Sequence, residues 1–537
     1  YGDHRDLHSF PTRRSSDLSA ALDQAQEAIG KLDYSKANQL LEEAIRARSE
    51  AGPEVEMARL LLAETSLVVG RWERAQRELD RLVDSAESPE VKVRSLLGQG
   101  DLFSMRGEPE QSRDYLNKAR TAAEAAGLKR LELMAVERQI ALAGQTGEVD
   151  QSRILLERVE KELEPHAQDP EWQEVCASFD RQWGLYYFRV SQRANAEESL
   201  AMALNRLRKL PTRSLEEANV LRFLGVMASL RREHQRALGY HLKALEIYTT
   251  AGDRYGQAKV YDSIGRTMQG ANRLDEAVFT FKKSESLCRR LGAHAELATL
   301  YGKLGQVALL REDMEGAIRY FQKDLELSSR YRNYYALGYS YRNLGRCLMQ
   351  VSRFEDAVVN LKESIGLLQF VEDWMNLARV YMDLGFAHAR AGQLKEAAEV
   401  RERAAALFQE HDLQRELTFL GCLDGILARA DNQLEQAEAH FRNCIEALSG
   451  SSAGAWLAET YCELGVLYRQ FKQTAQATEA FKSAVRTARG AGLARQVGRY
   501  LQELETLDEI ELFRVWMEDL PAQGDSQEGP ANDRASS

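Results

Sequence analysis

The chain has 537 residues, and its 82 acidic side chains outnumber its 71 basic ones, which gives a formal net charge of −11. This balance argues against a protein that coats nucleic acid over its whole surface. No apolar run reaches the ~18 residues of a membrane-spanning helix. Six scattered cysteines without a CxxC pair favour structural thiols in a reducing compartment, so we expect a cytoplasmic protein.

The first eighteen residues differ in composition from all that follow, being rich in His and Arg and poor in apolar periodicity. Read codon by codon, residues 1–18 resemble a common sequencing adapter translated in frame. We therefore expect this segment to be non-native and leave it out of the fold prediction. The alternative is a basic N-terminal arm or targeting segment. The native N-terminus stays open, and with it any signal peptide or preceding domain.

A period of 40 residues runs through most of the chain. Glycine recurs at this step at Gly225, Gly265, Gly305, Gly345, Gly385, Gly425 and Gly465, and an alanine follows each glycine 12 residues later. Within one unit the apolar residues are three or four apart, which predicts two amphipathic helices joined by a turn. Including looser units near the N-terminus, we expect about twelve helical hairpins and no strand.

The regularity of this period divides the chain into segments. We expect divergent hairpins over residues 19–177 and a regular 40-residue array over residues 178–490. Residues 491–520 are predicted to form a C-terminal capping helix, because an open end of a repeat stack would expose an apolar face. The tail 521–537 lacks apolar periodicity and is predicted to be disordered.

The repeats resemble the tetratricopeptide repeat family in motifs such as YGKLGQVALLREDMEGAIRYFQKDLEL (301–327) and YRNLGRCLMQVSRFEDAVVNLKESI (341–365). The common family unit has about 34 residues. The longer units here look like the repeats of cell-polarity scaffolds and bacterial regulatory proteins. The resemblance implies an all-α, right-handed solenoid in which the first helix of each hairpin lines a concave groove.

Catalytic and metal motifs are nearly missing from the sequence. The pattern GxSxG occurs once, at residues 450–454, but a catalytic serine there needs a preceding strand, and a helix precedes it. Cys422 and Cys462 occupy the same repeat position, which favours two small half-buried residues over a metal site. We therefore expect no enzyme activity, no cofactor and no metal.

The family's groove positions lie 6 and 3 residues before the repeat glycine and 1 and 4 residues after it. From the glycine at 184 to that at 465, these 32 positions hold nine basic and two acidic residues, a net charge of +7 in an acidic chain. A basic concave surface attracts an anionic partner, and arginine suits forked bonds to carboxylates. The predicted peptide-binding residues are Arg181, Arg222, Lys259, Arg266, Tyr339, Arg342, Asn343, Arg346, Arg379, Arg429 and Arg469; the resemblance implies that Asn343 grips a peptide backbone.

Several interpretations of these charges remain open. The groove could bind an acidic peptide, the arginines could be ordinary solvated charges, or the ligand could be nucleic acid or another phosphate, which we consider unlikely. The first hypothesis is a non-enzymatic scaffold that binds an acidic protein segment. The second is a regulatory or ligand-sensing region of a larger signalling or transcription-regulatory protein whose N-terminal effector domain is missing. The third is an enzyme with an unrecognised site. No membrane association is expected, and partner identity and oligomeric state stay open.

One repeat departs from the pattern in three places. Arg401 stands where phenylalanine recurs, and Asp424 stands where leucine recurs in the next first helix. Since two buried charges are tolerated mainly when they pair, we expect Arg401 and Asp424 to form an ion pair. Gly421 replaces a recurring tyrosine, and loose packing there predicts a hinge.

Overall fold

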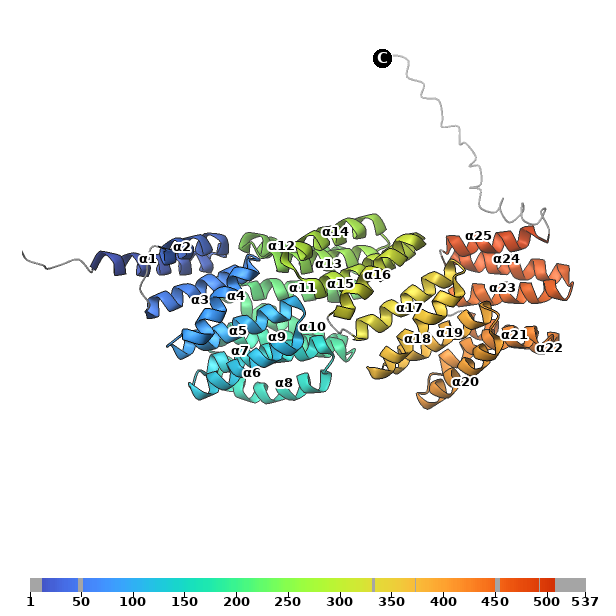
Figure 1. The fold of residues 1–537 in the computed structure, drawn as a ribbon, viewed down its shortest axis with the longest axis horizontal. Coiled ribbons are helices and arrows are strands. Elements are labelled where there is room, and N and C mark those ends of the chain that lie inside the picture. Colours follow the sequence, from blue (N-terminus) through green and yellow to red (C-terminus); the bar gives the residue numbers. More distant parts are fainter. Residues whose placement is uncertain are drawn as a thin grey trace, which may run out of the picture. The chain divides into compact units, whose positions relative to one another are not determined.

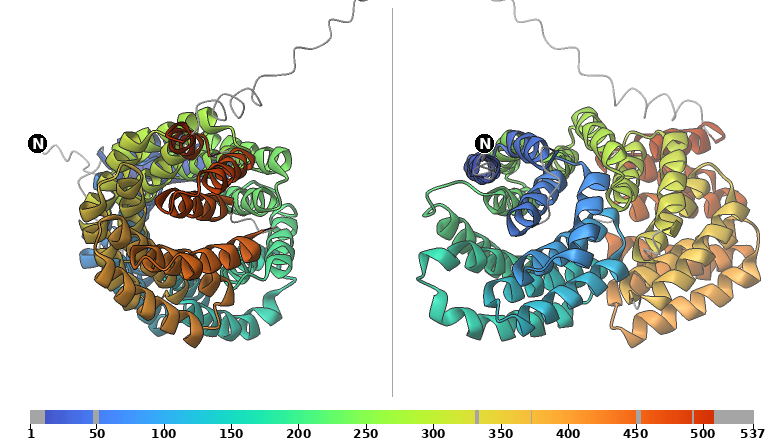
Figure 2. Two further views of the ribbon diagram at one scale, coloured as in Figure 1. Left: turned by 90° about the vertical axis from the view of Figure 1, so that its right-hand side faces the viewer. Right: turned by 60° about the vertical axis from the view of Figure 1, so that its left-hand side comes forward.

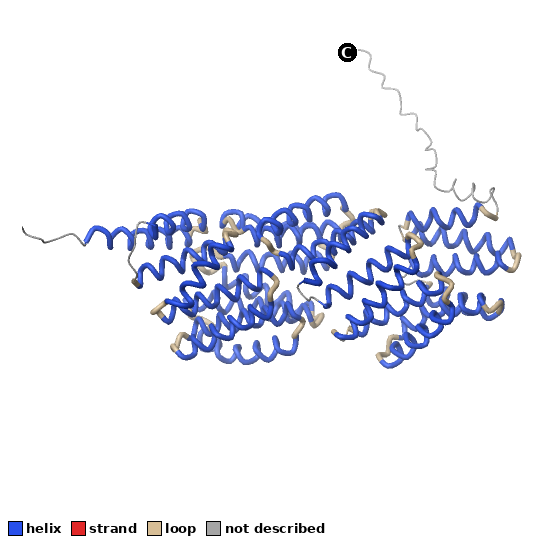
Figure 3. Tube along the Cα trace, in the orientation of Figure 1, coloured by secondary structure: helices blue, strands red, loops and turns tan. Residues whose placement is uncertain are grey.

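The computed structural model describes residues 12–46, 52–330, 334–371, 373–449, 454–491 and 493–507. These residues form 25 α-helices and two short 3-10 helices and contain no strand (Figures 1 and 3). The α-helices divide into two compact units, α1 to α16 and α17 to α25, which are described separately.

The first unit contains α1 (Thr12–Gly30), α2 (Tyr34–Arg46), α3 (Pro53–Val68), α4 (Trp72–Ser85), α5 (Pro89–Arg106), α6 (Pro109–Ala125), α7 (Lys129–Thr146), α8 (Val149–Leu163), α9 (Gln173–Arg189), α10 (Arg193–Leu207), α11 (Leu215–Leu230), α12 (His234–Ala251), α13 (Arg254–Gly270), α14 (Leu274–Leu291), α15 (His294–Leu310) and α16 (Met314–Arg330). Its 3-10 helices are η1 (Glu164–His166) and η2 (Pro170–Trp172). The second unit contains α17 (Tyr334–Gln350), α18 (Phe354–Phe370), α19 (Trp374–Arg390), α20 (Leu394–Glu410), α21 (Gln414–Ala430), α22 (Leu434–Leu448), α23 (Gly454–Gln470), α24 (Thr474–Gly490) and α25 (Ala494–Glu505).

Consecutive helices pack in pairs, from α1 with α2 to α23 with α24, and α25 packs against α24. The described residues thus contain twelve hairpins and a further helix, which confirms the predicted solenoid of helical hairpins. Helix α1 begins at Thr12, inside the segment that we expected to be non-native, and Leu18 is buried in its core. The GxSxG residues 450–453 and the tail 521–537 lie outside the described residues.

The repeat glycines mark the closest approach within each hairpin. The side chain 16 residues after the glycine lies directly over it, and a Cβ on the glycine would come within 2.5–2.8 Å of that side chain. The contact joins Gly184 to Leu200, Gly265 to Phe281, Gly305 to Phe321, Gly345 to Leu361, Gly425 to Phe441 and Gly465 to Phe481. The glycine is therefore required by a large buried side chain of its own hairpin, since such a contact leaves no room for a methyl group.

The turn inside each hairpin also repeats. The residue seven positions after the glycine adopts the left-handed conformation in every regular unit. Its φ is 59–62° at Arg232, Asn272, Glu312, Ser352, Asn432 and Lys472, and 76° at Gly392. A non-glycine residue is strained at this φ, so the tight connection between the two helices overrides local preference.

Arg401 and Asp424 form the ion pair that the sequence predicts. Arg401 Nε lies 2.6 Å from Asp424 Oδ1, and its Nη2 lies 2.8 Å from Oδ2. The pair joins α20 to α21, and Gly385 is covered by Leu423 instead of the missing phenylalanine. The bidentate bond with Asp424 raises the pKa of Arg401.

Replacing one partner of this pair should cost more than replacing both. We expect Asp424→Leu to destabilise the second unit by about 1–2 kcal/mol, because Arg401 loses its counter-ion while its side chain is 34% exposed. The double variant Arg401→Phe/Asp424→Leu restores the recurring residues and should recover that loss. Hydrogen exchange of the α20 and α21 amides in both variants measures the difference, and a double variant no more stable than Asp424→Leu would contradict the coupling.

The first unit turns back on itself (Figure 2). The rings of Trp72 in α4 and Tyr255 in α13 meet edge to face, with their centroids 5.8 Å apart. The turn at Gly107 is so close to Ala295 in α15 that a Cβ on the glycine would lie 2.6 Å from the alanine side chain. The early hairpins of this unit therefore pack against its late hairpins and enclose the odd-numbered helices.

The second unit makes a similar turn. Arg495 in α25 donates a hydrogen bond of 3.1 Å to the backbone oxygen of Gln350 at the end of α17. Phe386 in α19 lies against Trp456 in α23, with ring centroids 4.9 Å apart. The odd-numbered helices of each unit thus face one another, and we call this side of each unit its inner side.

Candidate functional site

The inner side of the second unit is largely filled by its own side chains. At the positions that the family uses for a groove, six side chains are at most 8% exposed: Met382, Phe386, Phe419, Cys422, Ile426 and Cys462. Cys422 and Cys462 are therefore core residues, more deeply buried than expected. Because the turn is narrow, residues that would line an open groove pack against each other.

Charged side chains complete this filling. Arg390 at the end of α19 pairs with both Glu459 and Glu463 of α23. Glu463 also pairs with Arg429 of α21, 2.8 Å away. The pair with Glu463 is the main cause that raises the pKa of Arg390, against the effect of burial. Three odd-numbered helices are thus tied together by one buried carboxylate.

Most of the predicted site arginines of this unit have partners within the chain. Arg342 Nε lies 2.7 Å from Asp383, whose side chain is only 5% exposed. Arg469 pairs with Glu503 of α25. Together with Arg429, these side chains join neighbouring first helices. Their guanidinium groups are therefore occupied by ion pairs within the chain.

Two predicted arginines are available to solvent. Arg346 and Arg379 are exposed, and neither forms an ion pair with a described residue. Asn343 is half-buried on the same helix as Arg346. Tyr339 is occupied, because its hydroxyl donates to Asp373 at 3.3 Å and accepts a hydrogen bond from Asn376.

The first unit has a charged inner side. Arg181 in α9, another predicted site residue, pairs with Glu216 of α11 and, at 2.9 Å, with Glu137 of α7. Burial opposes charge on Arg181, but the two carboxylates outweigh it and raise its pKa. Arg266 lies 3.4 Å from Asp262 in its own helix, and its side chain is 42% exposed.

Arg222 and Lys259 differ from these residues. Neither forms an ion pair with a described residue. The Arg222 guanidinium lies over the ring of its neighbour Phe223, 4.1 Å from the centroid, and its buried Nε has no hydrogen-bond partner. The Lys259 ammonium lies 4.3 Å from the centroid of Tyr255. The predicted peptide-binding cations therefore fall into three groups: arginines in ion pairs, exposed arginines, and the unpaired residues Arg222 and Lys259.

The sequence prediction missed the acidic partners. Asp383 and Glu463 lie two residues before the repeat glycine, and Glu216 lies nine residues before it, outside the four positions that were counted. The net charge of −11 for the whole chain was a signal that such acidic partners exist. An acidic chain with a surplus of basic inner positions must place carboxylates elsewhere, and neighbouring helices are the nearest place.

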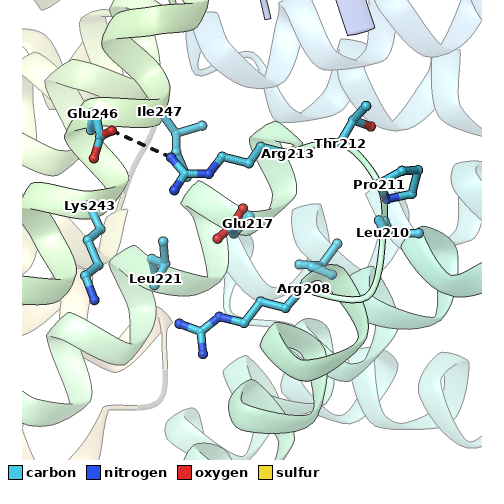
Figure 4. A pocket seen from close by; sticks show the side chains of 11 residues that line it. Arg208, Leu210, Pro211, Thr212, Arg213, Glu217, Leu221, Lys243, Glu246 and Ile247 are labelled. Carbon is cyan, nitrogen blue, oxygen red and sulfur yellow. Dashed lines mark ion pairs between the residues drawn. The ribbon is translucent and has the colours of Figure 1, made fainter. Parts of the chain in front are cut away.

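A notch of about 380 Å³ lies between the loop 208–214 and α12 (Figure 4). Arg208 and Lys243 line it, and Arg213 pairs with Glu246 across 3.7 Å at its edge. Within the described residues no group of three His, Cys, Asp or Glu side chains is placed to hold a metal ion. None of the described helices is long and apolar enough to cross a membrane.

Comparisons with known proteins identify the repeats. Family models described as "Tetratricopeptide repeat" match residues 216–290, 296–369, 339–410 and 458–490. A search of curated protein sequences gives no match.

Two solved structures are similar to the chain at low sequence identity. The apo form of RapI matches with a TM-score of 0.54 and 13% identity, over 66% of this chain and 97% of that one. Aspartyl phosphate phosphatase F from Bacillus subtilis matches with a TM-score of 0.46 and 14% identity, over 66% and 93%. The likeness to RapI concerns the fold alone. The repeated hairpins and the matching family models show that this chain contains tetratricopeptide repeats.

Proposed function

We propose that the protein is a non-enzymatic scaffold that binds an acidic protein segment through cations on its odd-numbered helices. Tetratricopeptide repeats are protein-interaction repeats, and a stack of hairpins offers extended surface. The observation that carries the acidic preference is the division of the inner-side cations. Carboxylates of the chain neutralise most of them, but Arg346 and Arg379 are exposed and form no ion pair with a described residue.

Arg346 and Arg379 favour a segment that crosses from α17 to α19. They come from consecutive first helices, so a bound segment could contact both hairpins. Arginine forms charge-assisted, forked bonds with carboxylates. Exposed pairs of this kind contribute modestly to affinity and strongly to partner choice, which suits a scaffold that selects among protein segments.

The structure also decides which variants can test this function. Charge reversal at Arg342 would remove the counter-ion of the buried Asp383 and place a second carboxylate near it, which would disrupt the fold. The double variant Arg346→Glu/Arg379→Glu avoids that problem, because both side chains are exposed. The matched control is Lys362→Glu/Lys395→Glu, which reverses two exposed charges on the second helices α18 and α20.

We expect the Arg346→Glu/Arg379→Glu variant to bind acidic peptides about tenfold more weakly than the wild type, a change of about 1.4 kcal/mol. Fluorescence anisotropy with a library of labelled Asp- and Glu-rich peptides measures this change. The control variant should bind as the wild type does. Equal binding by the wild type and the Arg346→Glu/Arg379→Glu variant would contradict the assignment.

A further inference from the structure

The second unit exposes large apolar side chains at the edge where one hairpin connects to the next. Phe370, the last residue of α18, is 71% exposed, and Met375 in the first turn of α19 is 51% exposed. Trp374 at the start of α19 and Tyr334 at the start of α17 are also exposed. In a stack of hairpins the first helices begin and the second helices end at the same edge. These four side chains therefore lie along one edge of the unit, and we call them the apolar edge.

The repeat pattern does not require large apolar residues at this edge. The positions that correspond to Phe370 at the 40-residue step are polar: Thr250, Arg290, Arg330 and Glu410. Outside the apolar edge, the positions that correspond to Trp374 hold Arg254, His294, Gln414 and Gly454. The packing of a hairpin thus does not account for these residues. Large apolar side chains that gather on an exposed surface mark interaction sites.

Ring contacts hold the side chains of the apolar edge in place. The rings of Tyr334 and Phe370 meet edge to face, with centroids 5.1 Å apart, and join α17 to α18. The ring of Trp374 stacks on that of His411, just after α20, with centroids 5.1 Å apart. Side chains fixed in this way lose little conformational freedom when a partner binds, so they suit a docking surface.

The apolar edge continues into the exposed arginines of the proposed function. Met375 and Arg379 are four residues apart in α19, and both are exposed, so they lie one helical turn apart on the same face. Asp373, which precedes this helix, is occupied elsewhere. Its carboxylate accepts hydrogen bonds from Asn376 at 2.8 Å and from Tyr339 at 3.3 Å. Apolar surface thus adjoins an exposed positive charge.

This combination selects a partner by its chemistry. A carboxylate beside the partner's apolar residue would be attracted to Arg379, whereas a basic side chain there would be repelled. A symmetric contact between two copies of this edge would bring two Arg379 side chains into one interface, and like charges oppose such an association. The charge therefore favours an acidic partner over a second copy of the chain.

We propose that the apolar edge docks a large aromatic or aliphatic side chain of a protein segment whose acidic residues contact Arg379 and Arg346. This inference rests on the proposed function and gives the segment a second requirement, an apolar residue near its carboxylates. At a rise of about 1.5 Å per residue, Met375 and Arg379 are about 6 Å apart along the helix axis. An extended segment covers that length in two residues, at about 3.3 Å each. The apolar residue should therefore lie two positions from an acidic one.

The test measures what one phenylalanine adds to an acidic peptide. The full chain is titrated into labelled hexaglutamate and into a labelled hexapeptide with phenylalanine at the third position among five glutamates, and fluorescence anisotropy follows binding. The phenylalanine peptide should bind about tenfold more tightly, although it carries one charge less. This ratio should persist in about 0.5 M sodium chloride, because salt screens ion pairs but not apolar contact. Equal affinities, or a ratio that disappears in salt, would overturn the proposal.

Variants at exposed positions locate the gain on the surface. The double variant Phe370→Ser/Met375→Ser should bind the phenylalanine peptide no more tightly than hexaglutamate. Its affinity for hexaglutamate should equal that of the wild type, which shows that the fold is intact. The matched control Val359→Ser removes another exposed apolar side chain of α18 and should keep the preference. A preference that survives in Phe370→Ser/Met375→Ser would overturn the assignment to the apolar edge.

Sedimentation velocity without peptide tests a second copy of the chain as the occupant. The wild type and the Phe370→Ser/Met375→Ser variant should sediment alike over a range of concentrations. Association of the wild type that the double variant abolishes would show that the apolar edge joins two copies, and it would overturn the proposal.

The apolar edge and the proposed function can fail separately. If hexaglutamate binds through Arg346 and Arg379 and the phenylalanine adds nothing, the scaffold function stands and the apolar edge fails. If the phenylalanine peptide binds through Phe370 and Met375 and the Arg346→Glu/Arg379→Glu variant binds it equally well, the docking surface stands and the acidic preference fails.

Discussion

Alanine at Gly425 should destabilise the second unit by about 2–3 kcal/mol, whereas alanine at Gly421, one turn earlier in α21, should stabilise it by about 1 kcal/mol. A Cβ at Gly425 would lie 2.5 Å from the ring of Phe441, which is fully buried and cannot withdraw. A Cβ at Gly421 would meet its nearest neighbour, the Cys444 side chain, at 3.5 Å, an ordinary contact. Both variants gain the same helix propensity, so the difference isolates the ring contact.

Hydrogen exchange of the α21 and α22 amides is the suitable measurement, because stacked repeats do not unfold in one step. Equal stabilisation by both alanines would contradict the packing role of the repeat glycine. The hinge at Gly421 stays a prediction. The hydrogen-exchange rates of the wild-type amides around Gly421 test it. A hinge requires faster exchange there than in α23.

Replacing Glu463 by glutamine should destabilise the second unit by about 3 kcal/mol, because Arg390 and Arg429 lose their shared counter-ion in an interior where Glu463 is only 4% exposed. Glu479→Gln is the matched control. Glu479 is 66% exposed and pairs with Lys482 at 2.9 Å on the surface, so its loss should cost less than about 1 kcal/mol. Hydrogen exchange of the amides of α19, α21 and α23 in increasing urea compares the stability of the two variants. Similar losses of stability in both variants would contradict the role of Glu463.

Acid should weaken the same network. Burial raises the pKa of Glu459, but Arg390 and Arg499 outweigh it and hold the pKa of this carboxyl below its ordinary value. A carboxyl whose pKa is lowered by folding contributes stability above its unfolded pKa and loses it as the pH falls through the folded value. Between pH 5 and pH 3, Glu459→Gln should therefore lose less stability than the wild type does. An identical loss in both would contradict the assignment.

The sequence predicts the features that depend on neighbours along the chain. The 40-residue step predicts the hairpins, and the paired departures at Arg401 and Asp424 predict their ion pair, because consecutive helices must touch whatever the curvature of the array. The partners of Arg390 were not predictable in this way. They lie on α23, beyond the adjacent first helix α21, and that distance depends on how tightly the unit turns.

The tightness of the turn depends on small packing differences added over several hairpins, and a period does not encode it. For the same reason the inner positions of the second unit were expected to line a groove and prove to be core. Arg342 shows the consequence for a single residue: its repeat position is the predicted one, and Asp383 on the next first helix decides what it can bind.

The contact between Trp72 and Tyr255 bears on how this protein can evolve. An open row of repeats gains or loses one member by duplication or deletion, because each member touches only its neighbours. In the first unit, an added hairpin between these two rings would separate surfaces that are now joined. The contact between early and late hairpins therefore fixes the number of hairpins between them. New binding specificity must then arise by substitution within the existing hairpins.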